Sequence, residues 1–151
     1  MLIVGEDYTP QEMIVIAGSR VLEDKKVVFV GTGLPMIATL LAQKTHAPGI
    51  IAVFEAGAVG PTLESGLPFS VGDSHTSSGA SYVRGLNAAF ELTQRGFCDF
   101  GFIGGAEIDP YGNLNSTMMG KFPDDYMKPT QLGFRAAAAP ATWQLPANGP
   151  F

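Results

Sequence analysis

The sequence has little of what several classes of protein depend on. Its single cysteine, Cys98, excludes an internal disulfide framework. Nine basic residues stand against fourteen acidic ones, a net charge of −5, and no basic cluster marks a nucleic-acid or membrane surface. No apolar run approaches the roughly 20 residues that span a bilayer, and Met1–Asp7 lacks the basic start of a signal peptide. We therefore expect a cytoplasmic protein with no nucleic-acid or membrane partner.

Glycine is the residue in excess. There are 19 glycines among 151 residues, whereas the usual share is about 7%. Glycine at this level indicates many tight turns, such as those at the ligand-binding edge of an α/β sheet. The length and the 46% of apolar residues predict one folded domain that buries a core.

The first helix is predicted to begin after Thr9, because Thr9, Pro10 and Glu12 form a capping pattern. The helix continues to about Leu22, with Gly18 as a weak position. This pattern places a helix before the first strand.

Two short apolar runs predict strands buried on both faces, Val27–Val30 and Ile50–Phe54. Pro35 opens a helix between them, which ends near His46, a residue we expect at the helix end rather than in a ligand set. The alternation is that of a β-α-β unit and predicts an α/β fold with a parallel sheet.

The rest of the chain is less regular. Residues 55–81 are rich in glycine, proline and serine and are predicted to form a long loop. Residues 129–151 show no strand or helix pattern and are expected to form a loosely ordered tail. Three further elements are predicted: a helix over Ala80–Gly96 with Val83, Leu86, Phe90 and Thr93 on one face and Gly96 as its C-cap, a strand over Asp99–Ile103, and a turn entering a polar strand over Tyr111–Asn115.

Glu55 is the leading candidate for chemistry. It follows a predicted buried strand, at the strand end where α/β sheets bind ligands, and Gly57 lies two residues on. A partly shielded carboxylate can act as a nucleophile or a base, and a glycine N–H can approach a substrate oxygen closely. Position alone leaves open that Glu55 simply ends a strand and faces solvent.

Two other glycine turns follow predicted strands. Gly31 and Gly33 form half of a dinucleotide fingerprint and are candidates for a ligand loop, although a tight turn explains them equally well. Gly104 and Gly105 end the third strand and are candidates for substrate or oxyanion binding.

We expect structural rather than catalytic roles for the remaining reactive residues. Asp73, Ser74 and His75 are sequence neighbours, and a catalytic triad is instead assembled from separate segments. Two histidines and one cysteine without ligand spacing predict no metal site. Cys98 is expected to be a small buried residue.

Four blocks of the sequence together resemble the B subunit of the glutaconate-type family I CoA-transferases. They occur in the family's order and spacing between about Tyr8 and Lys128: VVFVGTGLPMIA, VFEAGAVGPTL, LPFSVGDSHTSSGAS and GFIGGAEIDPYGNLN. The resemblance implies a three-layer open sheet with flanking helices, and an A subunit that shares the active site. It maps the family's nucleophilic glutamate, in an E-x-G motif, onto Glu55. It also implies coenzyme A as substrate and covalent intermediate, with an acyl-CoA and a carboxylic or dicarboxylic acid as reactants and no permanently bound cofactor.

The resemblance divides the chain at Lys128. Residues 8–128 correspond to an incomplete domain of the B subunit, and residues 129–151 are atypical. The run from Arg135 to Pro140 is what a glycine-rich family segment would give in a shifted reading frame, so we expect a truncated or frameshifted chain.

Three alternatives stay open at this point. Relatives of this fold hydrolyse or decarboxylate CoA-bound acids. The chain could also be an inactive partner of an A subunit. The third is a nucleotide-binding domain, since Glu55 lies 22 residues after Gly33, where a ribose-binding acid would stand.

Overall fold

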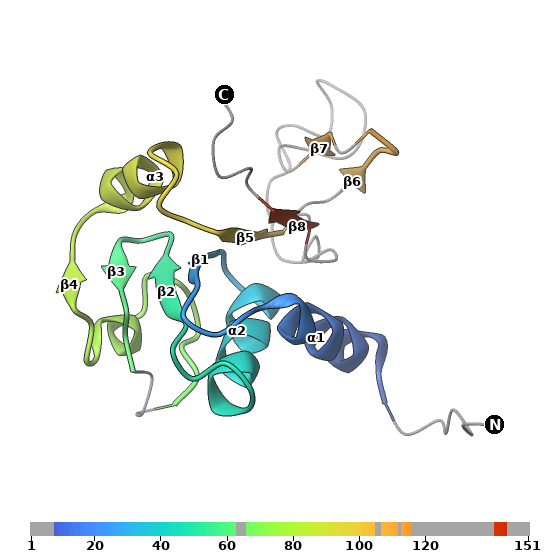
Figure 1. Cartoon of the computed structure of the whole chain (residues 1–151), viewed down its shortest axis with the longest axis horizontal. Helices are drawn as coiled ribbons and strands as arrows, with labels where there is room; N and C mark the ends of the chain where they lie inside the picture. The colour runs from blue at the N-terminus through green and yellow to red at the C-terminus, as the bar shows by residue number, and fades with distance from the viewer. Residues whose placement is uncertain (1–7, 63–65, 105–106, 112, 116–140, 145–151) are drawn as a thin grey trace, which may run out of the picture.

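The computed structural model describes residues 8–62, 66–104, 107–111, 113–115 and 141–144. A six-stranded sheet in the order β4-β3-β2-β1-β5-β8 carries helices on both faces, and β6 and β7 form a second, two-stranded sheet (Figure 1). The helices are α1 (Pro10–Val21), α2 (Leu34–Lys44), α3 (Leu86–Gln94) and the 3₁₀ helix η1 (Ser74–Ser77). The strands are β1 (Val27–Val30), β2 (Ile51–Phe54), β3 (Ala58–Val59), β4 (Tyr82–Val83), β5 (Phe100–Ile103), β6 (Glu107–Ile108), β7 (Leu114–Asn115) and β8 (Ala141–Gln144).

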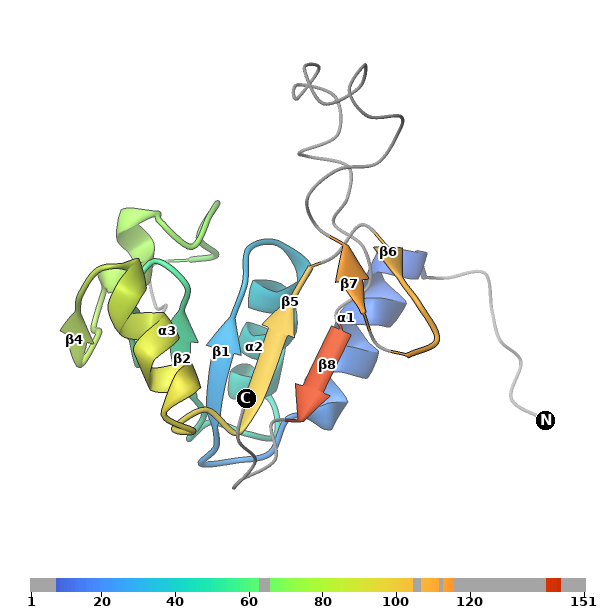
Figure 2. The ribbon, with the colours of Figure 1, turned by 90° about the horizontal axis from the view of Figure 1, so that it is seen from above.

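Strands β2, β1 and β5 form the parallel centre of the sheet. Val30 of β1 pairs with Phe54 of β2 on one side and with Phe102 of β5 on the other. The three strands therefore end at one edge of the sheet, as their parallel arrows in Figure 2 show. β1 covers the predicted residues 27–30, and β2 begins one residue after the predicted start. The predicted α/β class with an open, mixed sheet is confirmed.

The two faces of the sheet bury separate cores, because neighbouring strand residues point to opposite sides. Helices α1 and α2 cover one face and α3 the other, with α3 in front of the strands and α2 behind them in Figure 2. The larger core joins Val15 of α1 and Ala38 of α2 to strand residues such as Val30, while the smaller one joins Ala89 of α3 to Phe29.

The N-terminus of α1 is the predicted capping box. The Thr9 hydroxyl accepts the Glu12 N–H at 3.2 Å, and the Glu12 carboxylate accepts the Thr9 N–H at 2.6 Å. The Thr9 hydroxyl also donates to this carboxylate at 2.9 Å. The hydrogen bonds from the Thr9 N–H and the Thr9 hydroxyl hold the pKa of Glu12 below its ordinary value. Gly18, expected to weaken the helix, is buried where a Cβ would lie 3.4 Å from the Ala38 Cβ, so it permits close packing of α1 on α2.

The third helix departs from its predicted bounds and face. It begins at Leu86, with Gly85 as N-cap, because residues 82–83 pair with β3 as strand β4. Ala89 is its buried residue, whereas Leu86 and Phe90 are exposed, so the predicted apolar face was wrong. The helix ends at Gln94 with Arg95 as its C-cap, one residue before the predicted Gly96. Gly96 follows the cap with φ +74° and donates to the Thr93 carbonyl.

Strand pairing occurs in two regions where no strand was predicted. β3 and β4 lie within or beside the predicted loop and extend the sheet antiparallel to β2. In the tail, residues 141–144 form β8, antiparallel to β5, so the expectation of no strand in residues 129–151 was wrong there. β3 and β4 have two residues each, too few for a periodic pattern, and β8 lacks the continuous apolar run that marks β1. Backbone pairing with a neighbouring strand forms all three.

The turn predicted before residue 115 is present between β6 and β7. The Asp109 carboxylate accepts the N–H groups of Tyr111 and Asn113, each at 2.9 Å.

In the part of the chain described here, no helix has the length and apolar character needed to cross a membrane.

Candidate active site

Three turns meet at the carboxyl edge of the parallel strands. Gly31 follows β1, Glu55 follows β2 and Gly104 follows β5. Since the strands are in register at Val30 and Phe54, the turns after them lie at the same edge of the sheet. Open α/β sheets bind ligands at this edge.

Glu55 lies at this edge, directly after the last residue of β2. Its N–H donates to the Val30 carbonyl at 3.3 Å, which extends the ladder between β2 and β1 by one residue. The residue is half-buried, and among the described residues its side chain has no hydrogen-bond or ion-pair partner. A carboxylate that is fixed through its backbone and unpaired at its oxygens is available to a substrate.

Gly57 adopts a conformation that only glycine accepts readily. Its φ is +106°, and a Cβ added there would overlap the Arg84 carbonyl oxygen and lie 2.7 Å from the Gly85 carbonyl oxygen. Its N–H donates to the Phe54 carbonyl at 2.8 Å. The N–H is therefore committed within the chain, and the expected oxyanion role of Gly57 would require that this hydrogen bond be shared.

The turn between β1 and α2 favours glycine at positions 31 and 33, for lack of space at the first and for a positive φ at the second. The Gly31 N–H donates to the Phe102 carbonyl at 2.7 Å, and a Cβ on Gly31 would come within 2.9 Å of the same oxygen. Gly33 has φ +91° and is the N-cap of α2, without a side-chain capping bond. Their role in a ligand loop stays a prediction.

Gly104 is exposed at the end of β5, and a Cβ built on it would touch nothing within 4 Å. This open backbone leaves room for a ligand beside it. Gly105, the other candidate in this turn, lies outside the described residues.

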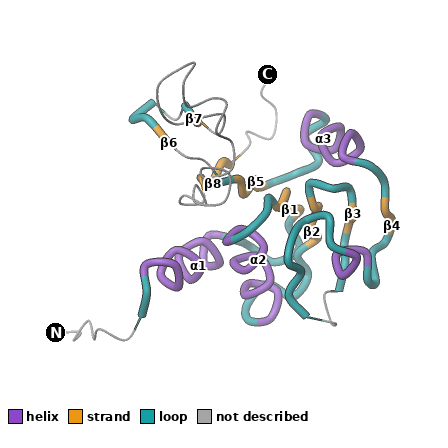
Figure 3. Tube along the Cα trace, turned by 180° about the vertical axis from the view of Figure 1, so that it is seen from behind, coloured by secondary structure: helices purple, strands orange, loops and turns teal. Residues whose placement is uncertain are grey.

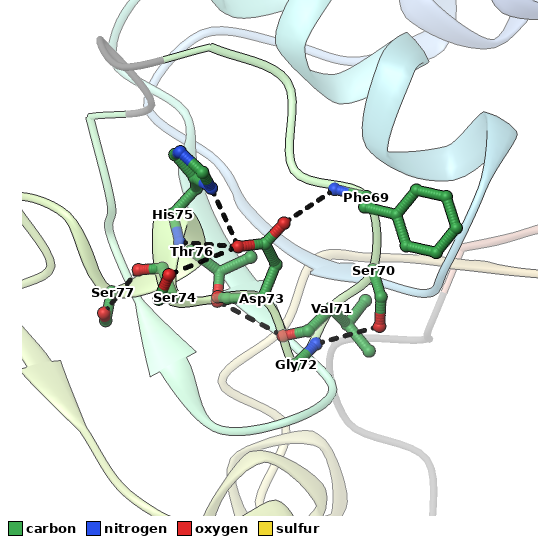
Figure 4. A network of polar contacts seen from close by, with 9 residues as sticks. All are labelled: Phe69, Ser70, Val71, Gly72, Asp73, Ser74, His75, Thr76 and Ser77. Atoms are coloured by element: carbon green, nitrogen blue, oxygen red, sulfur yellow. Dashed lines mark hydrogen bonds and ion pairs between the residues drawn. The ribbon is translucent and has the colours of Figure 1, made fainter.

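The Asp73 segment is a self-contained loop structure (Figure 4). The Asp73 carboxylate accepts the His75 N–H at 3.0 Å, the Phe69 N–H at 3.0 Å and the His75 Nδ1 at 2.8 Å. These three contacts, led by the His75 N–H, hold the pKa of Asp73 well below its ordinary range. The Ser74 hydroxyl donates to Asp73 at 3.4 Å, so the three residues do not form a serine–histidine–aspartate relay.

His46 and Cys98 lie where the sequence placed them, His46 at a helix end and Cys98 in the core. His46 follows α2, where its Nε2 lies 3.1 Å from the Leu22 carbonyl and its Nδ1 lies 3.0 Å from the Thr45 hydroxyl. Cys98 is buried in the core beneath α3, and burial raises the pKa of its thiol. No three histidine, cysteine, aspartate or glutamate side chains come together as a metal site among the residues that the structure describes.

A groove between β4 and α3 was not anticipated from the sequence. Its volume is about 440 Å³, and Figure 3 shows the two elements at the end of the sheet away from α1. The residues that line it are Tyr82, Arg84, Ala88, Glu91, Leu92 and Arg95. The spacing of residues 88, 91, 92 and 95 places them on one helix face, a signal that the sequence carries once the start of α3 is known.

Comparison with known proteins gives consistent results. Residues 11–137 match the family described as Coenzyme A transferase. The chain is 38% identical over 125 residues to the B subunit of 3-oxoadipate CoA-transferase from Pseudomonas knackmussii, a match that covers 81% of this chain and 45% of that protein. The chain thus spans about half the length of the curated relatives it matches.

Solved structures with the same fold include two with similar sequences. Glutaconate coenzyme A-transferase from Acidaminococcus fermentans has 33% identity and a TM-score of 0.65, over 77% of this chain and 46% of that one. The decarboxylase AibA/AibB has 29% identity and a TM-score of 0.66, over 87% of this chain and 55% of that one.

Proposed function

Because the chain belongs to the coenzyme A transferase family, we propose that it acts as the B subunit of an acyl-CoA:carboxylate CoA-transferase with Glu55 as nucleophile. The observation that carries the proposal is the half-buried Glu55 carboxylate after β2, which has no hydrogen-bond or ion-pair partner within the described part of the chain. Its position agrees with the sequence block in which the family resemblance places the nucleophile.

The reaction divides one exchange into steps through covalent intermediates. A Glu55 oxygen attacks the thioester carbonyl carbon of an acyl-CoA, the carbon–sulfur bond breaks, and CoA thiolate leaves behind an acyl-glutamyl anhydride. The thiolate attacks the glutamyl carbonyl, which releases the donor acid and forms a glutamyl-CoA thioester. An acceptor carboxylate then attacks this thioester, and the same two steps in reverse give the new acyl-CoA and free Glu55. This order predicts ping-pong kinetics.

Each step passes through a tetrahedral oxyanion, which backbone N–H groups can stabilise. The exposed Gly104 is a better source of such a donor than Gly57, because the Gly57 N–H already donates to Phe54. Gly105 stays a candidate from the sequence. The turn of Gly31 and Gly33 borders the same edge and would contact the substrate as a ligand loop.

A partner subunit fits this chemistry. The anhydride and thioester hydrolyse in water, and Glu55 is only half-buried in the chain alone. The relatives are named as B subunits, which implies an A subunit, and we expect that subunit to cover the site. The dicarboxylic acids in these names favour a dicarboxylic acceptor.

The test is Glu55→Gln, assayed with a cognate A subunit. We expect transfer to fall at least ~10³-fold because the amide cannot attack the thioester. Glu23→Gln is the matched control, since Glu23 is an exposed glutamate away from this edge, and it should retain full activity. Transfer by Glu55→Gln at the control's rate would refute the proposal.

A decarboxylase is the second candidate, favoured by the similarity to AibA/AibB. Decarboxylation needs no acyl transfer to the protein. Loss of carbon dioxide from a CoA-bound acid, without a glutamyl-CoA adduct and without CoA exchange between acids, would favour this activity over transfer.

A further inference from the structure

We infer that the tail strand β8 is a positioning element of the candidate active site, because it holds the end of β5 and with it the turn at Gly104. β8 pairs with β5 over four residues, and its first residue, Ala141, lies opposite Ile103, the last residue of β5. Gly104 follows directly. The consequence for CoA transfer rests on the proposed function, whereas the hold of β8 on β5 is measurable without it.

Among the three strands that lead to the site, β5 is the one that depends on the tail for a second neighbour. β1 lies between β2 and β5, and β2 lies between β1 and β3. β5 has β1 on one side and β8 on the other, and Figure 2 shows β8 alongside it. No other described strand pairs with the outer edge of β5. Without β8, the Gly104 turn would follow an edge strand, whose unpaired backbone groups permit local opening.

The backbone directions in β5 show which groups β8 satisfies. The Gly31 N–H donates to the Phe102 carbonyl at 2.7 Å, so the backbone groups of Phe102 face β1. Backbone groups of successive strand residues point to opposite sides, so those of Ile103 and Gly101 face β8. Gly101 lies opposite Trp143 and is half-buried, where an unpaired N–H or carbonyl is costly. The pairing therefore supplies partners that β5 needs up to its last residue.

The sequence of the tail suits a short strand at the edge of a sheet. Pro140 directly precedes β8, and Pro146 stands two residues after its end. Proline cannot donate a hydrogen bond to a neighbouring strand, so such residues limit pairing to the segment between them. We conclude that residues 141–144 are suited to close the sheet on the β5 side without offering a long edge of their own.

The position of Gly104 matters for chemistry because backbone donors stabilise an oxyanion only from fixed positions. Gly104 is exposed, and a Cβ built on it would touch nothing within 4 Å. Its surroundings therefore do not fix it, and its place is set through β5. A displaced donor loses a contact made in the transition state, which lowers kcat more than it raises KM.

The experiment places proline in β8 of the full-length chain. Trp143→Pro removes an N–H that faces Gly101, whereas Thr142→Pro removes one that faces away from β5 and is the matched control. Trp143→Ala keeps the N–H and separates the effect of the lost side chain. Ala141→Pro, which removes only the N–H opposite Ile103, is the milder variant to use if Trp143→Pro does not fold.

The first measurement is hydrogen exchange of single backbone amides by NMR. In Trp143→Pro, the amides of Gly101 and Ile103 should exchange at least about tenfold faster than in Thr142→Pro. The Phe102 amide faces β1 and should change less than about twofold, which makes it an internal control. The Gly104 amide resonance should shift in Trp143→Pro and remain in place in Thr142→Pro. Equal exchange in both proline variants, or equal acceleration of all three amides, would overturn the inference.

The second measurement is CoA transfer with a cognate A subunit. We expect kcat to fall about tenfold in Trp143→Pro with little change in KM, while Thr142→Pro matches the wild type. An unchanged kcat in a variant whose Gly101 and Ile103 amides exchange faster would also overturn the inference. A wild-type assembly that transfers no CoA would refute only the proposed function, since the exchange pattern and the Gly104 resonance test the hold of β8 directly.

Discussion

The backbones of Gly57 and Arg84 are locked together beside Glu55. The Arg84 N–H donates to the Gly57 carbonyl at 2.9 Å, and the Arg84 carbonyl occupies the space that a side chain at position 57 would need. The contact joins the turn after β2 to the segment that leads into α3. It therefore sets where the Glu55 turn lies relative to the groove between β4 and α3.

Gly57→Ala should disrupt this contact. The new Cβ would overlap the Arg84 carbonyl, and alanine disfavours a φ of +106°. We expect a loss of about 3 kcal/mol in the free energy of unfolding, measured by chemical denaturation. Gly104→Ala is the matched control, since a Cβ there meets nothing, and should change stability by less than about 0.5 kcal/mol. Equal stabilities for the two variants would show that the contact does not constrain the turn.

Asp99 should contribute to stability through the backbone rather than through its ion pair. Its carboxylate accepts the Val27 N–H at 2.9 Å and the Lys26 ammonium at 3.1 Å, and the ion pair is substantially exposed. Burial tends to raise the pKa of Asp99, but these two donors outweigh it and lower the pKa. Asp99→Ala strands the Val27 N–H and should cost about 1–2 kcal/mol in denaturation. Lys26→Met should cost under about 0.5 kcal/mol; a larger loss there would contradict this account.

Loop 69–77 should be stable well into acid. Because the folded state lowers the pKa of Asp73, its stabilisation is fully present above the ordinary carboxyl pKa near 4 and is lost as pH falls through the lower folded value. Hydrogen exchange would measure the protection factors of the backbone amides of residues 73–77 as a function of pH. These protection factors should be unchanged down to pH 4 and should fall below it. Asp73→Ala should remove that acid transition. Early loss of protection near pH 5 in the wild type would contradict the assignment.

The parallel centre of the fold could be predicted because its signals are local. Val27–Val30 is an uninterrupted apolar, mostly β-branched run, and Gly33 with Pro35 marks the start of α2. The capping box at Thr9 and the positive φ of Gly96 after the end of α3 also depend on residues within one turn. Glu55 was placed at a strand end by the same reasoning.

The remainder depends on contacts between distant segments. The two-residue strands β3 and β4 form by pairing across the loop from Gly60 to Ser81, and this pairing delays the start of α3 to Leu86. Because α3 approaches the sheet through the small Ala89, the larger Leu86 and Phe90 remain outside, although the Phe90 ring contacts Phe29. The Arg84 and Arg95 groove follows from that placement, so no local pattern in the sequence revealed it.

The most direct test of the central claim is to locate the covalent intermediate. The chain and a cognate A subunit would be incubated with acyl-CoA, treated with hydroxylamine, digested and analysed by peptide mass spectrometry. A glutamyl thioester or anhydride at Glu55 predicts a hydroxamate on that residue and on no other glutamate. An unmodified Glu55 in an assembly that transfers CoA would contradict the account.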